Sequence, residues 1–318
     1  MPEYGFERKS FQSNIVKIVV TILMLAVMFV WTIVITPDHG GFVPIGYRKQ
    51  LLVDFINVGQ GDAVLLRTPR GKNFLIDGGT NTTSTQAKIE NRELVQEYLR
   101  KVGVSSLDGI VVTHPHNDHL GGIIPVLKRY KTNKVWDCGS SFNTVTYEDY
   151  IALCDKKRIP RVAVKAGDIL DWGEELFVQV LHPTHISKSL EFSDMNNKSV
   201  TLLIRFGKVT MLLTGDIEEK AQKEVARYGN GLAGQIIKAP HHGSETSLHL
   251  PFIKSVSPVQ AVIQAGRDNP FGHPSDKMLN LYRNMGIKIF RNDQHGNIRL
   301  AIGGTDIKDF SFEVDRKF

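Results

Sequence analysis

Short apolar runs alternate with polar loops along most of the chain, and this pattern predicts many short strands interleaved with helices. Residues 50–58, 63–68 and 73–77 are apolar runs joined by glycine-containing turns, so they predict an antiparallel meander of three strands. In residues 90–102 the apolar side chains recur at the period of a helix, and we expect this stripe to pack on the sheet.

The alternation continues to the end of the chain, so the fold is predicted to be α/β, with helices layered on a sheet. Further helices are predicted at residues 146–156, 218–228 and 276–285. Further strands are predicted at residues 109–112, 135–138, 159–164, 176–181, 200–206, 209–213, 236–240, 259–264, 287–290 and 297–302, with an edge strand in 308–318.

Histidines and aspartates recur directly after predicted strands. The largest group, Thr113–Gly122, follows the apolar run Gly109–Val112. The other positions of this kind are Asp77, His182, Asp216, the pair His241 and His242, and His273. Because strand ends on one edge of a sheet bring their loops together, these side chains are predicted to line one cleft.

The sequence from His114 to His119 reads HPHNDH and has the composition of a metal site. His114 and His116 are two residues apart, so extended backbone would direct both side chains to the same side. Asp118 and His119 are adjacent, so they would point apart, and each pair could bind its own ion. Imidazole and carboxylate ligands suit zinc and tolerate iron or manganese.

Two aspartates at strand ends have candidate roles in the same site. Asp77 precedes two glycines, so it is either a simple turn former or an acceptor that orients a ligand histidine. Asp216 occupies a similar position, and its carboxylate could bridge two cations.

The composition is that of a globular protein large enough to bury a substantial core. The 318 residues are 42% hydrophobic and 23% charged, and the net charge of +6 favours anionic partners without a dense basic run. Only two cysteines occur, Cys138 and Cys154, and they are either a disulfide or two unpaired buried thiols.

The N-terminal region predicts a membrane anchor. Residues 18–35 carry no charged side chain, and the span is placed at 15–36, after a short segment 1–14. A cleavable signal peptide is the alternative, but its apolar region is usually shorter and ends in a small-residue site. Basic residues before the span place the N-terminus in the cytoplasm and the domain outside the cell membrane. A linker at 37–46 and one folded domain at 47–318 follow.

The motifs together resemble the metallo-β-lactamase superfamily and, within it, the hydrolase domain of ComEC-type competence proteins. The resemblance covers Leu51 to about Leu300. It rests on Val58–Asp62, Ile76–Gly79, the HPHNDH cluster, Leu213–Asp216, Pro240–Ser244 and Gly272–Pro274. It implies an αββα sandwich with a site for two divalent ions, zinc or manganese, at one edge. The competence protein also carries a channel of many spans, so DNA transport does not carry over.

The resemblance also implies a ligand set and a reaction. His114, His116 and His182 match the ligands of a first metal, Asp118, His119 and His242 those of a second, and Asp216 would bridge them. His241 and His273 would contact the phosphoryl group or protonate the leaving alkoxide, but the sequence leaves open which of His241 and His242 is the ligand.

The expected activity is hydrolysis of phosphodiesters, DNA included, by a hydroxide that the two metals share. Alternatives are a phosphoesterase for cell-wall polymers or phosphocholine, and a metal-bearing protein that binds DNA without cutting it. Hydrolysis of β-lactams is less favoured, because a bridging Asp216 suits phosphate oxygens.

Overall fold

The computed structural model describes residues 19–24, 50–81, 85, 93–186 and 194–315. The chain divides into two compact units, residues 1–47 and 48–318. Residues 19–24 are helical, and among the described residues no helix is both long and apolar enough to cross a bilayer. The predicted segments 1–14 and 37–46, and most of the predicted anchor at 15–36, lie outside the described residues.

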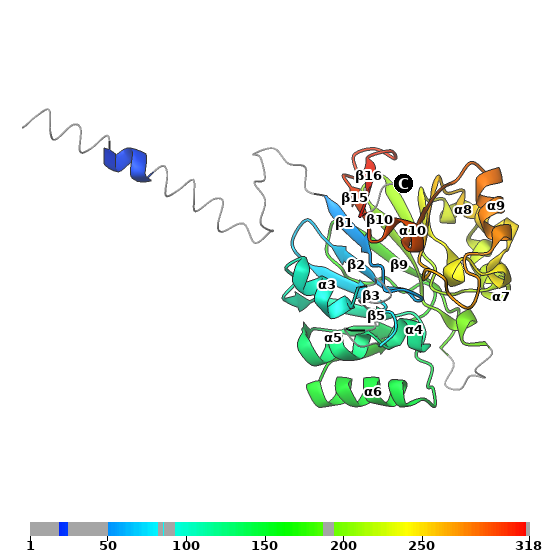
Figure 1. The fold of residues 1–318 in the computed structure, drawn as a ribbon, viewed down its shortest axis with the longest axis horizontal. Helices are drawn as coiled ribbons and strands as arrows, with labels where there is room; N and C mark the ends of the chain where they lie inside the picture. Colours follow the sequence, from blue (N-terminus) through cyan, green and yellow to red (C-terminus); the bar gives the residue numbers. More distant parts are fainter. Residues whose placement is uncertain (1–18, 25–49, 82–84, 86–92, 187–193, 316–318) are drawn as a thin grey trace, which may run out of the picture. The chain divides into compact units, whose positions relative to one another are not determined.

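Two mixed sheets form the centre of the second unit (Figure 1). The eight-stranded sheet has the order β16 (Phe310–Val314), β15 (Ile298–Ile302), β1 (Leu51–Phe55), β2 (Val64–Arg67), β3 (Asn73–Ile76), β5 (Gly109–Val112), β7 (Val135–Asp137) and β8 (Arg161–Ala163). The six-stranded sheet has the order β14 (Lys288–Arg291), β13 (Gln260–Ile263), β12 (Ile236–Lys238), β11 (Val209–Leu213), β10 (Thr201–Phe206) and β9 (Leu176–His182). A short parallel pair joins β4 (Ser106–Leu107) and β6 (Lys131–Thr132).

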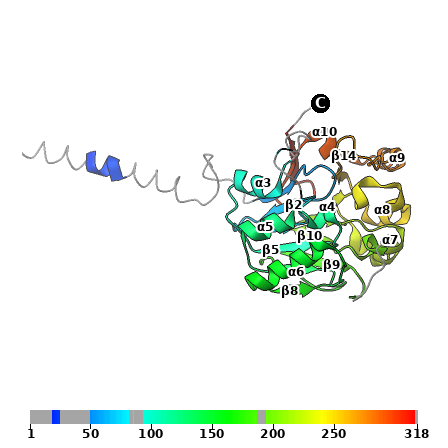
Figure 2. The ribbon, with the colours of Figure 1, turned by 60° about the horizontal axis from the view of Figure 1, so that its bottom comes forward.

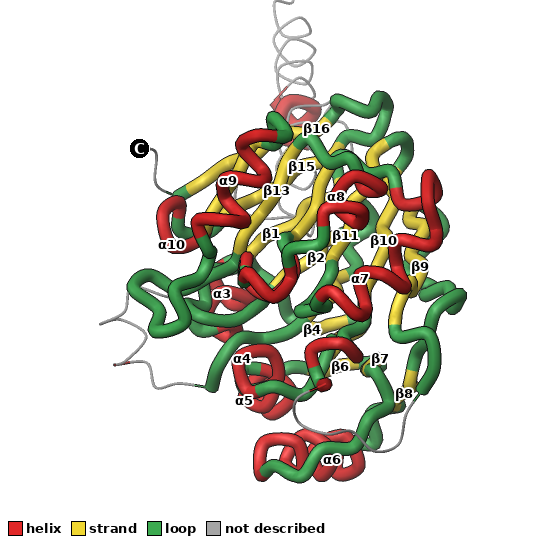
Figure 3. Tube along the Cα trace, turned by 90° about the vertical axis from the view of Figure 1, so that its right-hand side faces the viewer, coloured by secondary structure: helices red, strands yellow, loops and turns green. Residues whose placement is uncertain are grey.

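Helices cover the outer face of each sheet, which gives the four layers of an αββα sandwich (Figure 2). The helices associated with the eight-stranded sheet are α3 (Val95–Lys101), α4 (Asn117–Leu120), α5 (Ile123–Arg129) and α6 (Val145–Lys157). Those associated with the six-stranded sheet are α7 (Glu219–Val225), α8 (Leu250–Val256) and α9 (Asp276–Asn284), which Figure 3 shows in front of the strands. The other helical segments are α10 (Asn292–His295) and the 3-10 turns η2 (Asn196–Lys198), η3 (Ala226–Leu232), η4 (Pro240–Gly243) and η5 (Glu245–Ser247).

The main apolar core lies between the two sheets, and the two-residue period of the strands produces it. In β10, Leu202 and Ile204 belong to this inner core, whereas Leu203 between them belongs to the cluster under the helices of the outer face. Trp172 is fully buried in the inner core, where its ring stacks on Phe74 with centroids 4.3 Å apart. The predicted fold class and the sandwich expected from the resemblance are therefore confirmed for residues 50–315.

The direction of the strands determines where the polar loops meet. Strands β1, β2 and β3 form the predicted antiparallel meander, and β3, β5, β7 and β8 then run parallel. In the second sheet β11, β12, β13 and β14 are parallel. The carboxyl ends of parallel strands lie at one edge, where ligands of open α/β sheets usually bind.

Both cysteines are free and buried. Cys138 belongs to the inner core between the sheets, and Cys154 lies on α6 in the outer core of the eight-stranded sheet. Burial raises the pKa of each thiol to about 11, so both stay protonated at neutral pH. Cys138 and Cys154 are therefore two separate buried thiols and do not form a disulfide.

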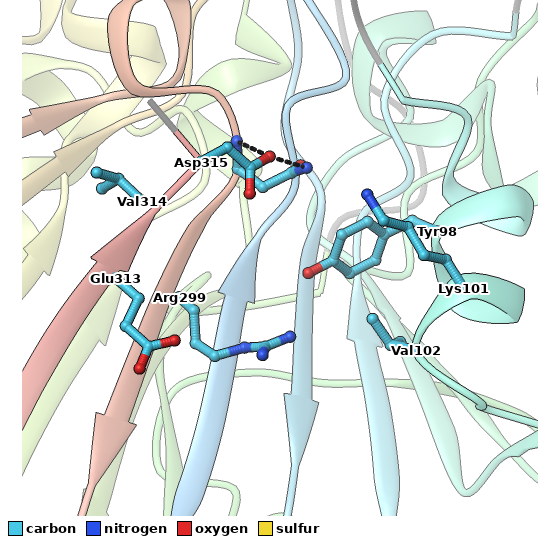
Figure 4. A pocket seen from close by; sticks show the side chains of 8 residues that line it. Tyr98, Lys101, Val102, Arg299, Glu313, Val314 and Asp315 are labelled. Carbon is cyan, nitrogen blue, oxygen red and sulfur yellow. Dashed lines mark hydrogen bonds between the residues drawn. The ribbon is translucent and has the colours of Figure 1, made fainter. Parts of the chain in front are cut away.

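A cluster of buried charged side chains lies on the outer face of the eight-stranded sheet. Asp54 on β1 is fully buried between Arg67 (3.0 Å) and Arg299 (2.6 Å). Beside it lies a cavity of about 260 Å³ in which Arg299, Lys101 and Tyr98 face Glu313 and Asp315 (Figure 4). These paired charges tie β15 to β1 and lie on elements other than those that carry the histidine loops.

Candidate metal centre

Four of the predicted ligands converge between the two sheets. Asp118, His119, Asp216 and His242 each place a ligand atom within 4.8 Å of those of the other three. The centre of the group is Oδ2 of Asp216, which lies 3.0 Å from Nε2 of His119 and 3.2 Å from Nε2 of His242. Asp118 completes the group, because its Oδ2 lies 3.2 Å from the same nitrogen of His242.

The outward nitrogens of the two histidines are already bonded, which orients the inward nitrogens. Nδ1 of His119 donates to Asp77 at 2.8 Å, and Nδ1 of His242 donates to the carbonyl of Gln264 at 2.9 Å. Each bond holds the ring so that Nε2 faces the group, as in protein metal sites. This donor set of nitrogen and carboxylate oxygen fits a divalent ion such as zinc or manganese.

His114 and His116 face each other beside this group, as their spacing predicted. Nε2 of His114 lies 3.0 Å from Nδ1 of His116. The ring centroids of His114 and His119 are 4.2 Å apart. On its other side His114 contacts the hydroxyl of Ser199 at 3.2 Å through Nδ1. Burial and the neighbouring His119 lower the pKa of His114 well below its usual range, so this ring is neutral and suited to bind a cation.

The prediction that Asp118 and His119 point apart is wrong, because both lie in the single turn of helix α4 rather than in extended backbone. In a helical turn adjacent side chains diverge by about 100° instead of 180°. Oδ2 of Asp118 and Nε2 of His119 are consequently 3.9 Å apart and face the same group.

The turn after β12 directs two consecutive histidines toward the cleft. His241 and His242 both have left-handed backbone, with φ of 47° and 54°. This conformation is costly for side chains other than glycine and is often found at functional sites. The structure places His242 inside the ligand group and His241 beside it, with ring centroids 5.9 Å apart.

Asp62 and Lys238 form a buried ion pair under the ligand group, and sequence reasoning assigned neither of them to the site. The ammonium of Lys238 contacts the carboxylate of Asp62 and lies 3.5 Å from Oδ1 of Asp216. Asp62 in turn lies 3.2 Å from Nδ1 of His242. Two features of the sequence could have identified this pair. Lys238 is the one charged residue in the apolar run Ile236–Ala239, and Asp62 lies in the turn before β2.

Charges in this buried group shift its pKa values in opposite directions. Burial alone would lower the pKa of His119 and His242, but the carboxylates around them, Asp216 above all, raise it well above its usual range. Burial alone would raise the pKa of Asp216 and Asp118, but the neighbouring histidines lower it well below its usual value. In the metal-free group the Lys238 ammonium and the protonated rings of His119 and His242 face the carboxylates, and divalent cations would take the place of the two ring protons.

Asp77 takes the second of its two predicted roles. Besides the bond from His119, its carboxylate accepts bonds from the backbone amide of Thr113 (2.8 Å) and from the Thr113 hydroxyl (2.7 Å). Asp77 thus anchors the start of the histidine loop and one of its rings at the same time.

His182 lies at the end of β9, where its ring faces protein groups on both sides. Its Nδ1 donates to the carbonyl of Ser199 at 3.2 Å, and its Nε2 lies 3.6 Å from the carboxylate of Glu224. His182 is not among the side chains whose ligand atoms converge. Its role as a metal ligand stays a prediction.

A cleft of about 330 Å³ opens above the ligand group. His241 and His273 line it, as expected, and so do residues that were not predicted, namely Gln60, Asn117, Asn196 and Phe271. Nδ1 of His241 lies 3.1 Å from the carboxylate of Glu218, which holds the ring from behind. Burial and the neighbouring His241 and His242 lower the pKa of His273 to about 4, so its ring is neutral at pH 7.

Most of this domain is similar in sequence to known proteins. The model of the metallo-beta-lactamase superfamily matches residues 56–267. ComE operon protein 3 of Bacillus subtilis (strain 168) is 29% identical over 256 residues, which cover 78% of this chain and 32% of that protein. Competence protein ComA of Neisseria gonorrhoeae is 29% identical over 262 residues, covering 82% and 34%. Recombination protein 2 of Haemophilus influenzae is 30% identical over 225 residues, covering 70% and 25%. The chain thus spans about a third or less of each relative.

Proposed function

The chain belongs to the metallo-β-lactamase superfamily, and from this membership we propose that it is a metal-dependent phosphodiesterase acting on nucleic acid. The fold and the converging histidines and aspartates are those of a metal-dependent hydrolase of this superfamily, and the relatives are competence proteins of the ComEC type. The phosphodiester specificity and the nucleic acid substrate are the proposed part.

The observation that carries the proposal is the position of the Asp216 carboxylate. One of its oxygens faces a histidine nitrogen on each side, at 3.0 Å from His119 and 3.2 Å from His242. Asp216 would help to hold two divalent ions, one together with His114 and His116 and the other together with Asp118, His119 and His242. Two ions side by side suit the in-line displacement at a phosphodiester. Bound there, they would activate a water molecule and stabilise the charge that develops on the phosphoryl oxygens.

The residues of the cleft would bind the phosphate and transfer the proton. His241 is partly exposed to the cleft, with Nδ1 beside the Glu218 carboxylate (3.1 Å) and Nε2 3.5 Å from the side-chain amide of Asn196, which also lines the cleft. That arrangement suits a group that protonates the leaving alkoxide. The neutral His273 would donate one N–H to a phosphoryl oxygen without changing its charge.

The names of the relatives and the sequence support nucleic acid as the substrate and a membrane as the location. Two relatives are named for competence or its operon and a third for recombination, and the net charge of +6 favours a polyanionic partner. The uncharged run at residues 18–35 supports an anchor with the hydrolase domain outside the cytoplasm.

Metal-dependent cleavage tests the proposal directly. The purified protein, loaded with zinc or manganese, is expected to cleave bis(p-nitrophenyl) phosphate and DNA, and a chelator should abolish both activities reversibly. Asp216→Asn removes the charge that would bridge the ions, so we expect at least a 100-fold loss of kcat, on the scale of other losses of electrostatic stabilisation. Asp155→Asn, on an exposed carboxylate of α6, is the matched control and should behave as the wild type.

Two outcomes would contradict the proposal. If the chain binds two ions but cleaves neither substrate, phosphodiesterase activity is rejected. The alternative of a phosphoesterase for cell-wall polymers or phosphocholine is then favoured. Tight DNA binding without cleavage at any metal concentration would instead favour a binding protein.

A further inference from the structure

An exposed phenylalanine stands at the rim of the cleft. Phe271 follows β13 on the loop that carries His273, and 65% of its surface is accessible although its ring is wholly apolar. Single exposed apolar side chains are common on protein surfaces, so exposure alone means little. Phe271 differs because it lines the same cleft as the ligands Asp118, Asp216 and His242.

Hydrogen bonds from Asn269 tie down the backbone of the loop on both sides of Phe271. The side-chain carbonyl of Asn269 accepts bonds from the amides of Phe271 (3.2 Å) and His273 (3.0 Å), and its amide donates to the carbonyls of Gly266 (2.9 Å) and His273 (2.6 Å). The ring also lies nearly parallel to that of His273, with centroids 5.8 Å apart and 22° between the planes. An ordered flat surface at this point loses little conformational entropy when a ligand stacks on it.

Rings continue from Phe271 across the metal centre. His273 lies 6.4 Å from His242 between ring centroids, and the two rings are inclined by 28°. Beyond the ligand group, His116 is followed by the partly buried Phe142 at 6.2 Å. One phenylalanine thus lies next to His273 and another next to His116, and both of these histidines line the cleft.

We propose that Phe271 is a stacking platform for the nucleobase next to the scissile phosphate, and that the site therefore favours single-stranded over double-stranded nucleic acid. The inference rests on the proposed function. A phosphate in the metal centre would carry its nucleoside toward the rim, where the face of Phe271 can accept any base. Bases within a duplex are already stacked and paired, so they cannot use this surface without being pulled out.

Equilibrium binding tests the platform without relying on cleavage. The probes are a fluorescein-labelled single strand with phosphorothioate linkages, which resist hydrolysis, and the corresponding duplex. For Phe271→Ala in the metal-loaded full chain, we expect binding of the single strand to weaken about 5- to 150-fold, the range for loss of one stacked base. Phe271→Trp should keep the affinity, and Ile307→Ala, another exposed apolar residue outside the cleft, should not change it.

Steady-state kinetics with two ester substrates distinguishes base stacking by Phe271 from a purely structural role of this residue in the loop. Phe271→Ala should raise KM for thymidine 5′-p-nitrophenyl phosphate and leave methyl p-nitrophenyl phosphate unchanged, because only the first ester carries a base. Equal losses on both esters, or wild-type affinity for the single strand in Phe271→Ala, would overturn the platform. A wild type that binds neither oligonucleotide, or both equally, would also overturn it.

Failure of the platform and failure of the proposed hydrolase are distinguishable. Binding of the single strand that depends on Phe271, without cleavage of any diester, would retain the platform and reject the hydrolase. Cleavage of the methyl ester together with oligonucleotide binding that is independent of residue 271 would retain the hydrolase and reject the platform.

Discussion

Lys238 shows at the scale of single residues how much charge the centre of this protein holds. Its side chain is almost completely buried at the end of β12, between Asp62 and Asp216. Burial alone would lower the pKa of this lysine, but the two carboxylates raise it, so the ammonium stays charged. Its ammonium lies 3.5 Å from Oδ1 of Asp216, whereas Oδ2 of the same carboxylate faces His119 and His242.

Removal of that charge should be costly. We expect Lys238→Met to lower the free energy of unfolding of the metal-free protein by about 3–5 kcal/mol, because buried carboxylates lose their partner. The matched substitution Lys220→Met breaks an exposed ion pair with Asp194 (3.0 Å) and should cost about 1 kcal/mol or less. Urea unfolding of the three proteins measures the difference, and equal losses in both variants would show that Lys238 contributes no more than a surface charge.

At the scale of elements, close backbone contacts position helix α4. Gly61 in the turn before β2 has a φ of 129°, and a Cβ there would lie 2.2 Å from the backbone oxygen of Asp118. In addition, the amide of Asp62 donates to that same oxygen at 3.1 Å. The turn between β1 and β2 therefore determines where α4 places its aspartate and histidine.

A methyl group at residue 61 should move α4 and weaken metal binding. Gly61→Ala is expected to lower zinc affinity at least tenfold, because Asp118 and His119 must shift together. Gly71→Ala is the control, since Gly71 also has a positive φ (79°) but open space around it, and it should only destabilise the fold by about 1–2 kcal/mol. Competition with a chromogenic zinc chelator measures the affinity. Unchanged affinity in Gly61→Ala would show that the turn does not position the ligands.

At the scale of the whole molecule, the metal centre joins the two sheets. Asp77, Asp118 and His119 come from loops of the eight-stranded sheet, whereas Asp216 and His242 come from the six-stranded sheet. An ion bound by both groups would resist their separation. The stability of the whole sandwich should therefore depend on the metal.

We expect zinc at 100 times its dissociation constant to stabilise the fold by about 2.7 kcal/mol at neutral pH. If the zinc concentration is then kept constant, the gain should grow between pH 6 and pH 8. In the metal-free protein His119 and His242 have raised pKa values, so protonation stabilises the fold fully below their ordinary pKa of 6.5. That contribution is lost as pH rises through the folded pKa values, while metal binding, which requires neutral rings, becomes easier. Thermal unfolding with and without zinc at both pH values tests this, and a shift that shrinks with pH would contradict it.

The sequence alone determined the local features of this protein. Short apolar runs predicted the strands of the two sheets, and the sequence also predicted the helices α3, α6, α7 and α9, whereas α8 (Leu250–Val256) was not predicted. The spacing in HPHNDH predicted that His114 and His116 face each other, which the structure confirms. The predicted helix at residues 90–102 is α3 only over Val95–Lys101 among the described residues, since helix ends leave a weaker pattern.

Only the tertiary structure decided which distant side chains meet. The polar loops were expected on one edge of one sheet, but they come from two sheets whose carboxyl ends face each other. That arrangement brings Lys238 to Asp62, Glu218 to His241, and His242 rather than His241 into the ligand group. Such contacts join residues far apart in the chain, and no local period records them. A sequence reports which side chains are available for a site, whereas the packing of the two sheets determines the distances between them.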